Sequence, residues 1–135
     1  MIVRLWRGWT TAAKADEYEA LLLDEILPGI QNRLSLGFRG IHLLRRDSKA
    51  EVEFVMIIVF DSLDAVRAFA GDEFERALVP EKARALLAHY DACAEHYDTI
   101  TKASGAGSGI LPSDRDRVSL SESLQRHFVV VRMTR

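Results

Sequence analysis

The stretch that most constrains this chain is EVEFVMIIVF, residues 51–60, because it is apolar at positions that point to both faces of a β-strand. Side chains alternate between the two faces of a strand, so a strand with one wet face alternates apolar and polar residues. Here the run FVMIIVF contains no polar residue. The pattern therefore predicts a central strand that is covered on both sides.

The segments around this strand predict the order strand, helix, strand, strand, helix, strand. Asp61 or Ser62 can cap the second helix and Gly71 can close it, while Pro28 and Gly29 end or distort the first. The order is that of a ferredoxin-like α+β sandwich with an antiparallel sheet and helices on one face. A second subunit is the economical cover for the other face. The expected elements are a strand at 1–9, a helix at 14–30, strands at 38–46 and 51–60, a helix at 63–70, helical segments at 72–78 and 81–92, and a strand at 95–100.

Length and charge exclude several classes of protein. The 135 residues fit one domain of ordinary size. A formal charge of -2 gives no electrostatic reason to expect nucleic acid or a membrane as partner. A single cysteine makes no internal disulfide, no signal-like segment opens the chain, and its longest apolar run is too short to span a bilayer. We expect a cytoplasmic protein.

The composition changes after Thr101. The segment KASGAGSG has the composition of a flexible linker, and the residues after it are polar until the last stretch. We expect a folded domain over 1–100, followed at 101–135 by a linker and a poorly ordered extension. Within that extension, SLSE has the form of a capping box and HFVVV has strand character, so local order is the alternative.

The stretch HYDACAEHY raises the question of a metal site. It places His89, Cys93 and His96 at spacings of four and three, which would put them on one face of a continuous helix. The helix is expected to end near Asp91 or Ala92, so the three side chains would no longer share a face. We therefore expect no metal.

Four stretches resemble the antibiotic biosynthesis monooxygenase family of dimeric α/β barrels. They are IVRLWRGWT, GFRGIHLLRRD, EVEFVMIIVFDSLDAVRAFAG and ARALLAHYDACAEHY, and the resemblance covers roughly residues 1–100. It implies a homodimer whose two sheets pack face to face, with a ligand cavity between sheet and helices in each subunit. It also implies a cofactor-independent monooxygenase-like activity on an aromatic or polycyclic small molecule.

The resemblance to heme-degrading members of that family fails at their functional residues. The Asn, Trp and His of those members fall near Trp6, Phe69 and Val79, and none of the three residue types is retained. The segment from Phe69 to Arg84 contains no histidine. Heme degradation is therefore disfavoured, and no cofactor is expected.

Oxygenation without a cofactor needs an aromatic-walled pocket, a base and a group that holds an anion. His42 is the candidate base, because it stands among apolar neighbours and an imidazole titrates near neutral pH. Arg4 is the candidate for the anion. As the alternative, His42 is a strand histidine with a satisfied hydrogen bond, Arg4 pairs with a carboxylate, and the aromatics are core. The candidate pocket residues are Trp6, Phe54, Phe69, Phe74 and Tyr90.

The rival hypothesis is a non-catalytic ligand-binding or interaction module of the same fold. The two differ in the cavity, since an enzyme needs an open pocket with His42 or Arg4 at its wall. Phosphate and nicotinamide chemistry are not supported, because the glycines of GAGSG precede no strand or helix pattern of the required kind.

Overall fold

The computed structural model describes residues 1–33 and 36–103, so all but the first three residues of the linker and extension predicted over 101–135 lie outside the described residues. Met1–Asp98 form a compact unit. None of the described helices is long and apolar enough to cross a membrane. The elements are β1 (Ile2–Thr10), a 3₁₀ turn η1 (Ala12–Lys14), α1 (Ala15–Leu21), a π-helical turn η2 (Leu22–Ile26), α2 (Leu27–Arg33), β2 (Phe38–Asp47), β3 (Val52–Phe60), α3 (Leu63–Ala70), α4 (Glu81–Leu86), β4 (His89–Tyr90) and β5 (Glu95–Asp98).

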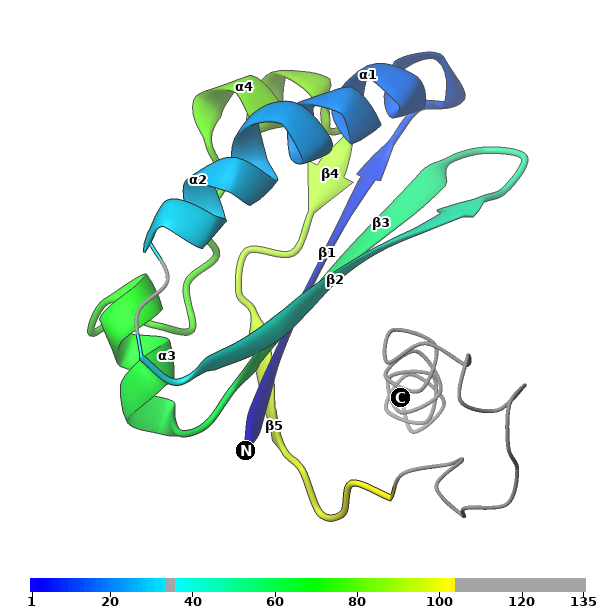
Figure 1. Ribbon diagram of the computed structural model, residues 1–135. Coiled ribbons are helices and arrows are strands. Elements are labelled where there is room, and N and C mark those ends of the chain that lie inside the picture. The colour runs from blue at the N-terminus through cyan, green and yellow to red at the C-terminus, as the bar shows by residue number, and fades with distance from the viewer. Residues whose placement is uncertain (34–35, 104–135) are drawn as a thin grey trace, which may run out of the picture. The chain divides into compact units, whose positions relative to one another are not determined.

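The strands form an antiparallel sheet in the order β2-β3-β1-β4, with β5 also paired to β1. This is the strand order of a ferredoxin-like fold, so the predicted fold class is confirmed. Helices α1, α2 and α4 lie on one face of the sheet (Figure 1). The two central strands, β1 and β3, pair along their whole length from Ile2 opposite Phe60 to Thr10 opposite Val52.

The central strand β3 is buried on both faces, as its sequence predicts. Phe54, Ile58 and Phe60 point toward the helices and belong to the two core clusters there. On the opposite face, Val55 and Ile57 are 8% and 1% exposed. A doubly apolar strand thus occupies the middle of the sheet, where it removes most apolar surface from water.

The first helix is distorted at Pro28 but does not end there. Proline has no N–H to donate, and one residue earlier the N–H of Leu27 bonds the carbonyl of Leu22, a π-helical step. The helix then continues to Arg33, three residues beyond the predicted end. This continuation brings Arg33 to the face that looks onto the sheet.

The second helix agrees with its predicted ends, whereas the segment after it does not. Ser62 accepts a hydrogen bond from the Ala65 N–H at 3.2 Å, and Gly71 closes α3 with a φ of 91°. The helix predicted over 72–78 is wrong, because its backbone pairs with the chain near Cys93. The Ala77 N–H donates to the carbonyl of residue 92, and the N–H of residue 94 donates to that of residue 75.

The helix predicted over 81–92 is too long, since α4 ends at Leu86. The backbone N–H groups of Ala88 and Asp91 donate instead to the carbonyls of Trp9 and Arg7, at 2.7 and 2.9 Å. The open edge of β1 needs hydrogen-bond partners, and satisfying it outweighs the local preference of residues 87–91 for a helix.

Candidate functional site

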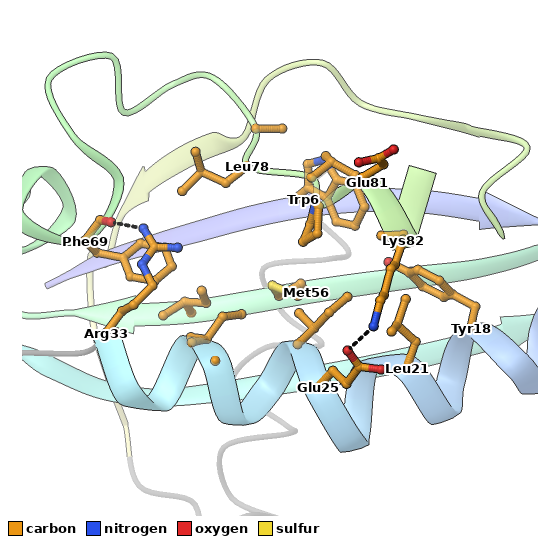
Figure 2. Close-up of a pocket in the computed structure, with 18 of the residues that line it drawn as sticks. Trp6, Tyr18, Leu21, Glu25, Arg33, Met56, Phe69, Leu78, Glu81 and Lys82 are labelled. Carbon is orange, nitrogen blue, oxygen red and sulfur yellow. Dashed lines mark hydrogen bonds and ion pairs between the residues drawn. The ribbon is translucent and has the colours of Figure 1, made fainter. Parts of the chain in front are cut away.

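A cavity of about 610 Å³ lies between the sheet and the helices. This volume is within the range of small-molecule sites. Its floor is formed by side chains of β1 and β3, one wall by the long helix from α1 to α2, and the opposite wall by the strap, residues 77–80, with the start of α4. Figure 2 shows side chains that line the cavity, between the sheet, the long helix and α4.

The floor follows directly from the strand register. Arg4 stands opposite Ile58 and Trp6 opposite Met56, so all four side chains share the helix-facing side of the sheet. The Trp6 indole is fixed, because its Nε1 donates to the carbonyl of Asp91 at 2.8 Å. The floor therefore combines an aromatic ring, the Trp6 indole, with a positive charge, the Arg4 guanidinium.

The helix wall is apolar apart from its rim. Tyr18, which is 1% exposed, meets the ring of Phe54 edge-on with centroids 4.8 Å apart. Burial raises the pKa of the Tyr18 hydroxyl, so this group stays protonated at neutral pH. At the rim, Glu25 and Lys82 form an ion pair at 2.9 Å that joins the long helix to α4 (Figure 2).

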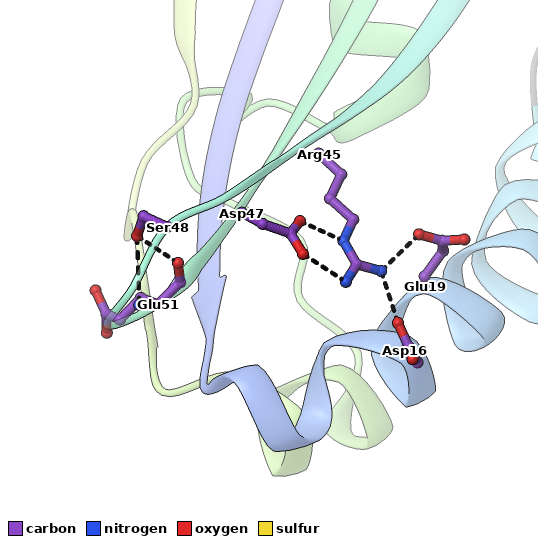
Figure 3. A network of polar contacts seen from close by, with 6 residues as sticks. All are labelled: Asp16, Glu19, Arg45, Asp47, Ser48 and Glu51. Carbon is purple, nitrogen blue, oxygen red and sulfur yellow. Dashed lines mark hydrogen bonds and ion pairs between the residues drawn. The ribbon is translucent and has the colours of Figure 1, made fainter.

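The N-terminal end of this wall is tied to the β2–β3 hairpin by Arg45. Its guanidinium donates to Asp16 and Glu19 of α1, at 2.9 and 2.8 Å, and to Asp47 at 2.8 Å (Figure 3). These hydrogen bonds raise the pKa of Arg45, with the bond to Asp47 contributing most. The network fixes α1 over the sheet edge.

Arg4 is the buried charge of the site, at 5% exposure. Its Nη1 donates to the carbonyl of Phe74 and lies 3.0 Å from His96 Nε2, while Nη2 lies 3.4 Å from the carbonyl of Arg76. Burial lowers the pKa of Arg4 to about 10, and the nearby charge of Arg33 acts in the same direction. Within residues 1–33 and 36–103, no carboxylate lies within ion-pair distance of Arg4. The alternative in which Arg4 pairs with a carboxylate is therefore not seen there.

His96 is the titratable neighbour of Arg4. Burial lowers its pKa, the positive charge of Arg4 lowers it further, and Glu75 opposes the shift. A neutral imidazole at pH 7 accepts a hydrogen bond from the guanidinium without neutralising its charge. Arg4 therefore keeps its full positive charge beneath the cavity.

The structure brings three of the seven candidate residues together at the cavity, namely Arg4, Trp6 and Phe69. Phe54 lies behind Tyr18 in the core, and Phe74 contacts the His96 ring with centroids 5.2 Å apart. Tyr90 is 38% exposed, with its ring centroid 6.2 Å from that of Trp6. These three residues are not in the cavity wall.

His42 lies on the other face of the sheet. It stands opposite Ile57, whereas the cavity floor uses the adjacent Ile58, and successive side chains of a strand point to opposite faces. His42 is therefore not placed to act as a base in this cavity. Burial lowers its pKa, as expected for a half-buried strand histidine.

Sequence reasoning missed the helix wall and the strap. Tyr18, Leu21, Ile26 and Ile30 were visible as an apolar stripe at helical spacing, and such a stripe indicates only a buried face. Part of that stripe lines a cavity. No sequence pattern indicated that Arg33 would line the cavity, because it follows a Pro-Gly pair that is typical of a helix end.

The two histidines of HYDACAEHY, His89 and His96, lie far apart. His89 stands opposite Trp9 on β1 and His96 opposite Arg4, five positions away. At about 3.4 Å per residue this is a separation of about 17 Å, too far to share one ion. His89 instead stacks on the Trp9 ring and contacts Glu51 at 2.9 Å. Within the described residues, no group of three or more His, Cys, Asp or Glu side chains could hold a metal.

No protein-family model matches the chain, and no curated protein matches it. Several solved structures share its fold. A proposed antibiotic biosynthesis monooxygenase from Bacillus cereus is 14% identical with a TM-score of 0.51, covering 76% of this chain and 97% of that one. A variant of SnoaB, a cofactor-independent oxygenase from Streptomyces nogalater, is 23% identical with a TM-score of 0.50, covering 74% and 94%.

An uncharacterized NIPSNAP domain protein from Burkholderia xenovorans is 20% identical with a TM-score of 0.50, covering 84% of this chain and 100% of that one. At these identities the likenesses establish a shared fold. This chain therefore has the ferredoxin-like α+β fold of the antibiotic biosynthesis monooxygenases, the family that its sequence resembles.

Proposed function

We propose that the protein is a cofactor-independent monooxygenase-like enzyme that acts on an aromatic or polycyclic phenol. The observation that carries this proposal is the cavity of about 610 Å³ with Trp6, Tyr18 and Phe69 in its wall and the buried cation Arg4 in its floor. Aromatic walls suit a planar ring, and a buried cation lowers the pKa of a phenol beside it. The names of two proteins that share the fold, an oxygenase and a monooxygenase, support the same choice.

The reaction needs little from the protein beyond stabilising the anion. A phenolate is electron-rich enough to reduce dioxygen directly, and phenol plus dioxygen gives quinone plus water without an external reductant. One oxygen atom forms the new carbonyl, the ring carbon loses its hydrogen, and the second oxygen leaves as water. Arg4 would hold the phenolate oxygen through a charge-assisted hydrogen bond, and the phenol proton would leave to water at the open rim.

A non-catalytic ligand-binding module is the second candidate. It is favoured by one observation, that the described cavity wall contains no histidine to act as a general base. Both candidates bind an aromatic ligand in the same place. They differ in whether dioxygen is consumed.

The test is oxygen uptake by the full chain with 1-naphthol and 1,8-dihydroxynaphthalene, in the presence of a chelator and without added flavin. We expect saturable uptake and one labelled oxygen atom in the quinone when ¹⁸O₂ is supplied. The variant Arg4→Met should lose uptake, whereas Arg39→Gln, an exposed arginine outside the cavity, should retain it. Binding of both phenols without uptake would favour the module.

The working unit is proposed to be a homodimer. The sheet face opposite the helices carries apolar side chains, among them Val3, Leu5 and Ile57. The dimeric barrel implied by the sequence resemblance would bury this face between two sheets. Sedimentation at micromolar concentration should show a dimer, and a single compact monomer would contradict it.

A further inference from the structure

One end of the cavity carries two guanidinium groups without a carboxylate partner in the described part of the chain. Arg4 is 5% exposed, and its contacts are two backbone carbonyls and the His96 ring. Buried charges in proteins are normally paired, because an unpaired one loses its hydration without compensation. A buried cation that borders an open cavity is therefore a place where a ligand can supply the missing charge.

Arg33 lies at the same end of the cavity. Its Nη2 donates to the carbonyl of Phe69 at 2.6 Å, as Figure 2 shows. The guanidinium carbons of Arg33 and Arg4 lie 4.8 and 5.9 Å from the centroid of the Phe69 ring. The side chain of Arg33 is exposed, so it stands at the rim while Arg4 lies deeper.

The remaining charged side chains of the cavity lie elsewhere and would not attract an anion. Glu25 is paired with Lys82 at 2.9 Å, and Glu81 stands beside Lys82 at the start of α4. Figure 2 shows these three residues at the opposite end of the cavity from Arg33 and Phe69. The cavity is thus polarised, with unpaired positive charge at one end only.

We propose that Arg33, beside Arg4, forms a carboxylate-binding subsite, and that the ligand of this cavity is an aromatic carboxylic acid whose carboxylate binds Arg33 while its phenolate oxygen stays with the deeper Arg4. This inference rests on the proposed function only in taking the cavity as the substrate site. The planar fork of an arginine matches a carboxylate with two parallel hydrogen bonds. The ring of the ligand would then extend over Trp6 and Met56, away from Glu25.

The subsite would set the orientation of the ligand as well as its affinity. A carboxylate bound at this end determines which edge of the ring faces the rest of the cavity floor. It would therefore select both the substrate and the ring carbon that reacts. Neutral aromatics of the same size would bind in several orientations, because the rest of the wall is largely apolar.

The experiment is an equilibrium binding measurement under anaerobic conditions, with 2-naphthoate and its neutral isostere 2-naphthamide as probes. For the full chain we expect the carboxylate to bind at least about tenfold more tightly than the amide, as a charge-assisted hydrogen bond gives. Arg33→Gln should remove most of this preference by weakening the binding of 2-naphthoate much more than that of 2-naphthamide. The matched control is Arg39→Gln, which should bind both probes as the original chain does.

Equal affinity for the two probes, or a preference that survives Arg33→Gln, would overturn the subsite. Tighter binding of 2-naphthyl phosphate than of 2-naphthoate would overturn its assignment to a carboxylate. The preference should also weaken as salt is raised, which gives a readout that needs no variant. The binding measurement is anaerobic, so it is independent of the oxygen-uptake test. Binding of the carboxylate without oxygen uptake would refute the proposed enzyme and support the subsite. Oxygen uptake with neutral phenols, without a preference for the carboxylate, would support the enzyme and refute the subsite.

Discussion

Gly8 lies against the indole of Trp6, which is part of the cavity floor, and Gly8→Ala should therefore move Trp6. Both residues lie on the helix-facing side of β1, two positions apart. A Cβ at Gly8 would stand 2.8 Å from Trp6 Cη2 and 3.0 Å from Leu87 Cδ2. Ordinary contacts begin at 3.4 Å, so the indole must retreat by about 0.6 Å. Glycine inside a strand is expected where another group approaches this closely.

The free energy of unfolding should fall by about 1–3.5 kcal/mol. Overpacking of this kind costs about 1–3 kcal/mol. Losing the hydrogen bond from Trp6 Nε1 to the Asp91 carbonyl adds about 1 kcal/mol. Replacing a glycine inside a strand by alanine raises the free energy of unfolding by about 0.5–1 kcal/mol, which offsets part of this loss. The net change corresponds to a Tm lower by about 4–28 °C for a folded unit of this size.

The assay combines thermal unfolding with tryptophan fluorescence in a Trp9→Phe background, so that Trp6 is the only tryptophan. We expect Gly8→Ala to lower Tm and to shift the Trp6 emission. Gly40→Ala is the matched control, because no atom lies within 4 Å of a Cβ built on that strand glycine, and it should be neutral or slightly stabilising. If Gly8→Ala unfolded at the same temperature as the original chain and left the Trp6 emission unchanged, the close packing of Trp6 against Gly8 would be refuted.

Three further predictions concern pH, the helix wall and the core. Burial lowers the pKa of His96 in the folded chain from 6.5, so the unfolded chain binds the proton first as pH falls, and stability should decrease as pH drops through 6.5 toward the lower pKa of the folded state. His96→Asn should flatten that fall, and an unchanged slope in chemical denaturation would contradict the shift. Arg45→Gln frees α1 from the hairpin and should speed amide hydrogen exchange in α1 while lowering Tm less than Gly8→Ala; no change in exchange would show that the network is not holding the helix. Phe60→Ala removes a 1% exposed ring from the core and should destabilise the fold by about 3–5 kcal/mol in denaturant titration, and a loss below about 1 kcal/mol would contradict its packing.

The sequence by itself determined the fold class and most element positions. A strand that is apolar on both faces has only a central place in a covered sheet, and the order of the elements along the chain indicated the ferredoxin-like fold. Ser62 and Gly71 marked the ends of α3, because an N-cap hydroxyl and a C-terminal glycine act through local backbone geometry. These signals are local, so they survive without knowledge of the tertiary structure.

Only the tertiary structure decided which residues form the cavity. His42 and the neighbouring Ile41 and Leu43 stand on a strand with apolar residues on both faces, so alternation gave no indication of which side met the helices. The segment 72–78 has a helical composition, yet its backbone pairs with the distant chain near Cys93 and forms no helix. Arg33 lies at the same end of the cavity as Arg4 because the helix continues past Pro28 after a π-helical turn. In each case a contact between residues far apart in sequence outweighed the local preference, and such contacts are not written in any one segment.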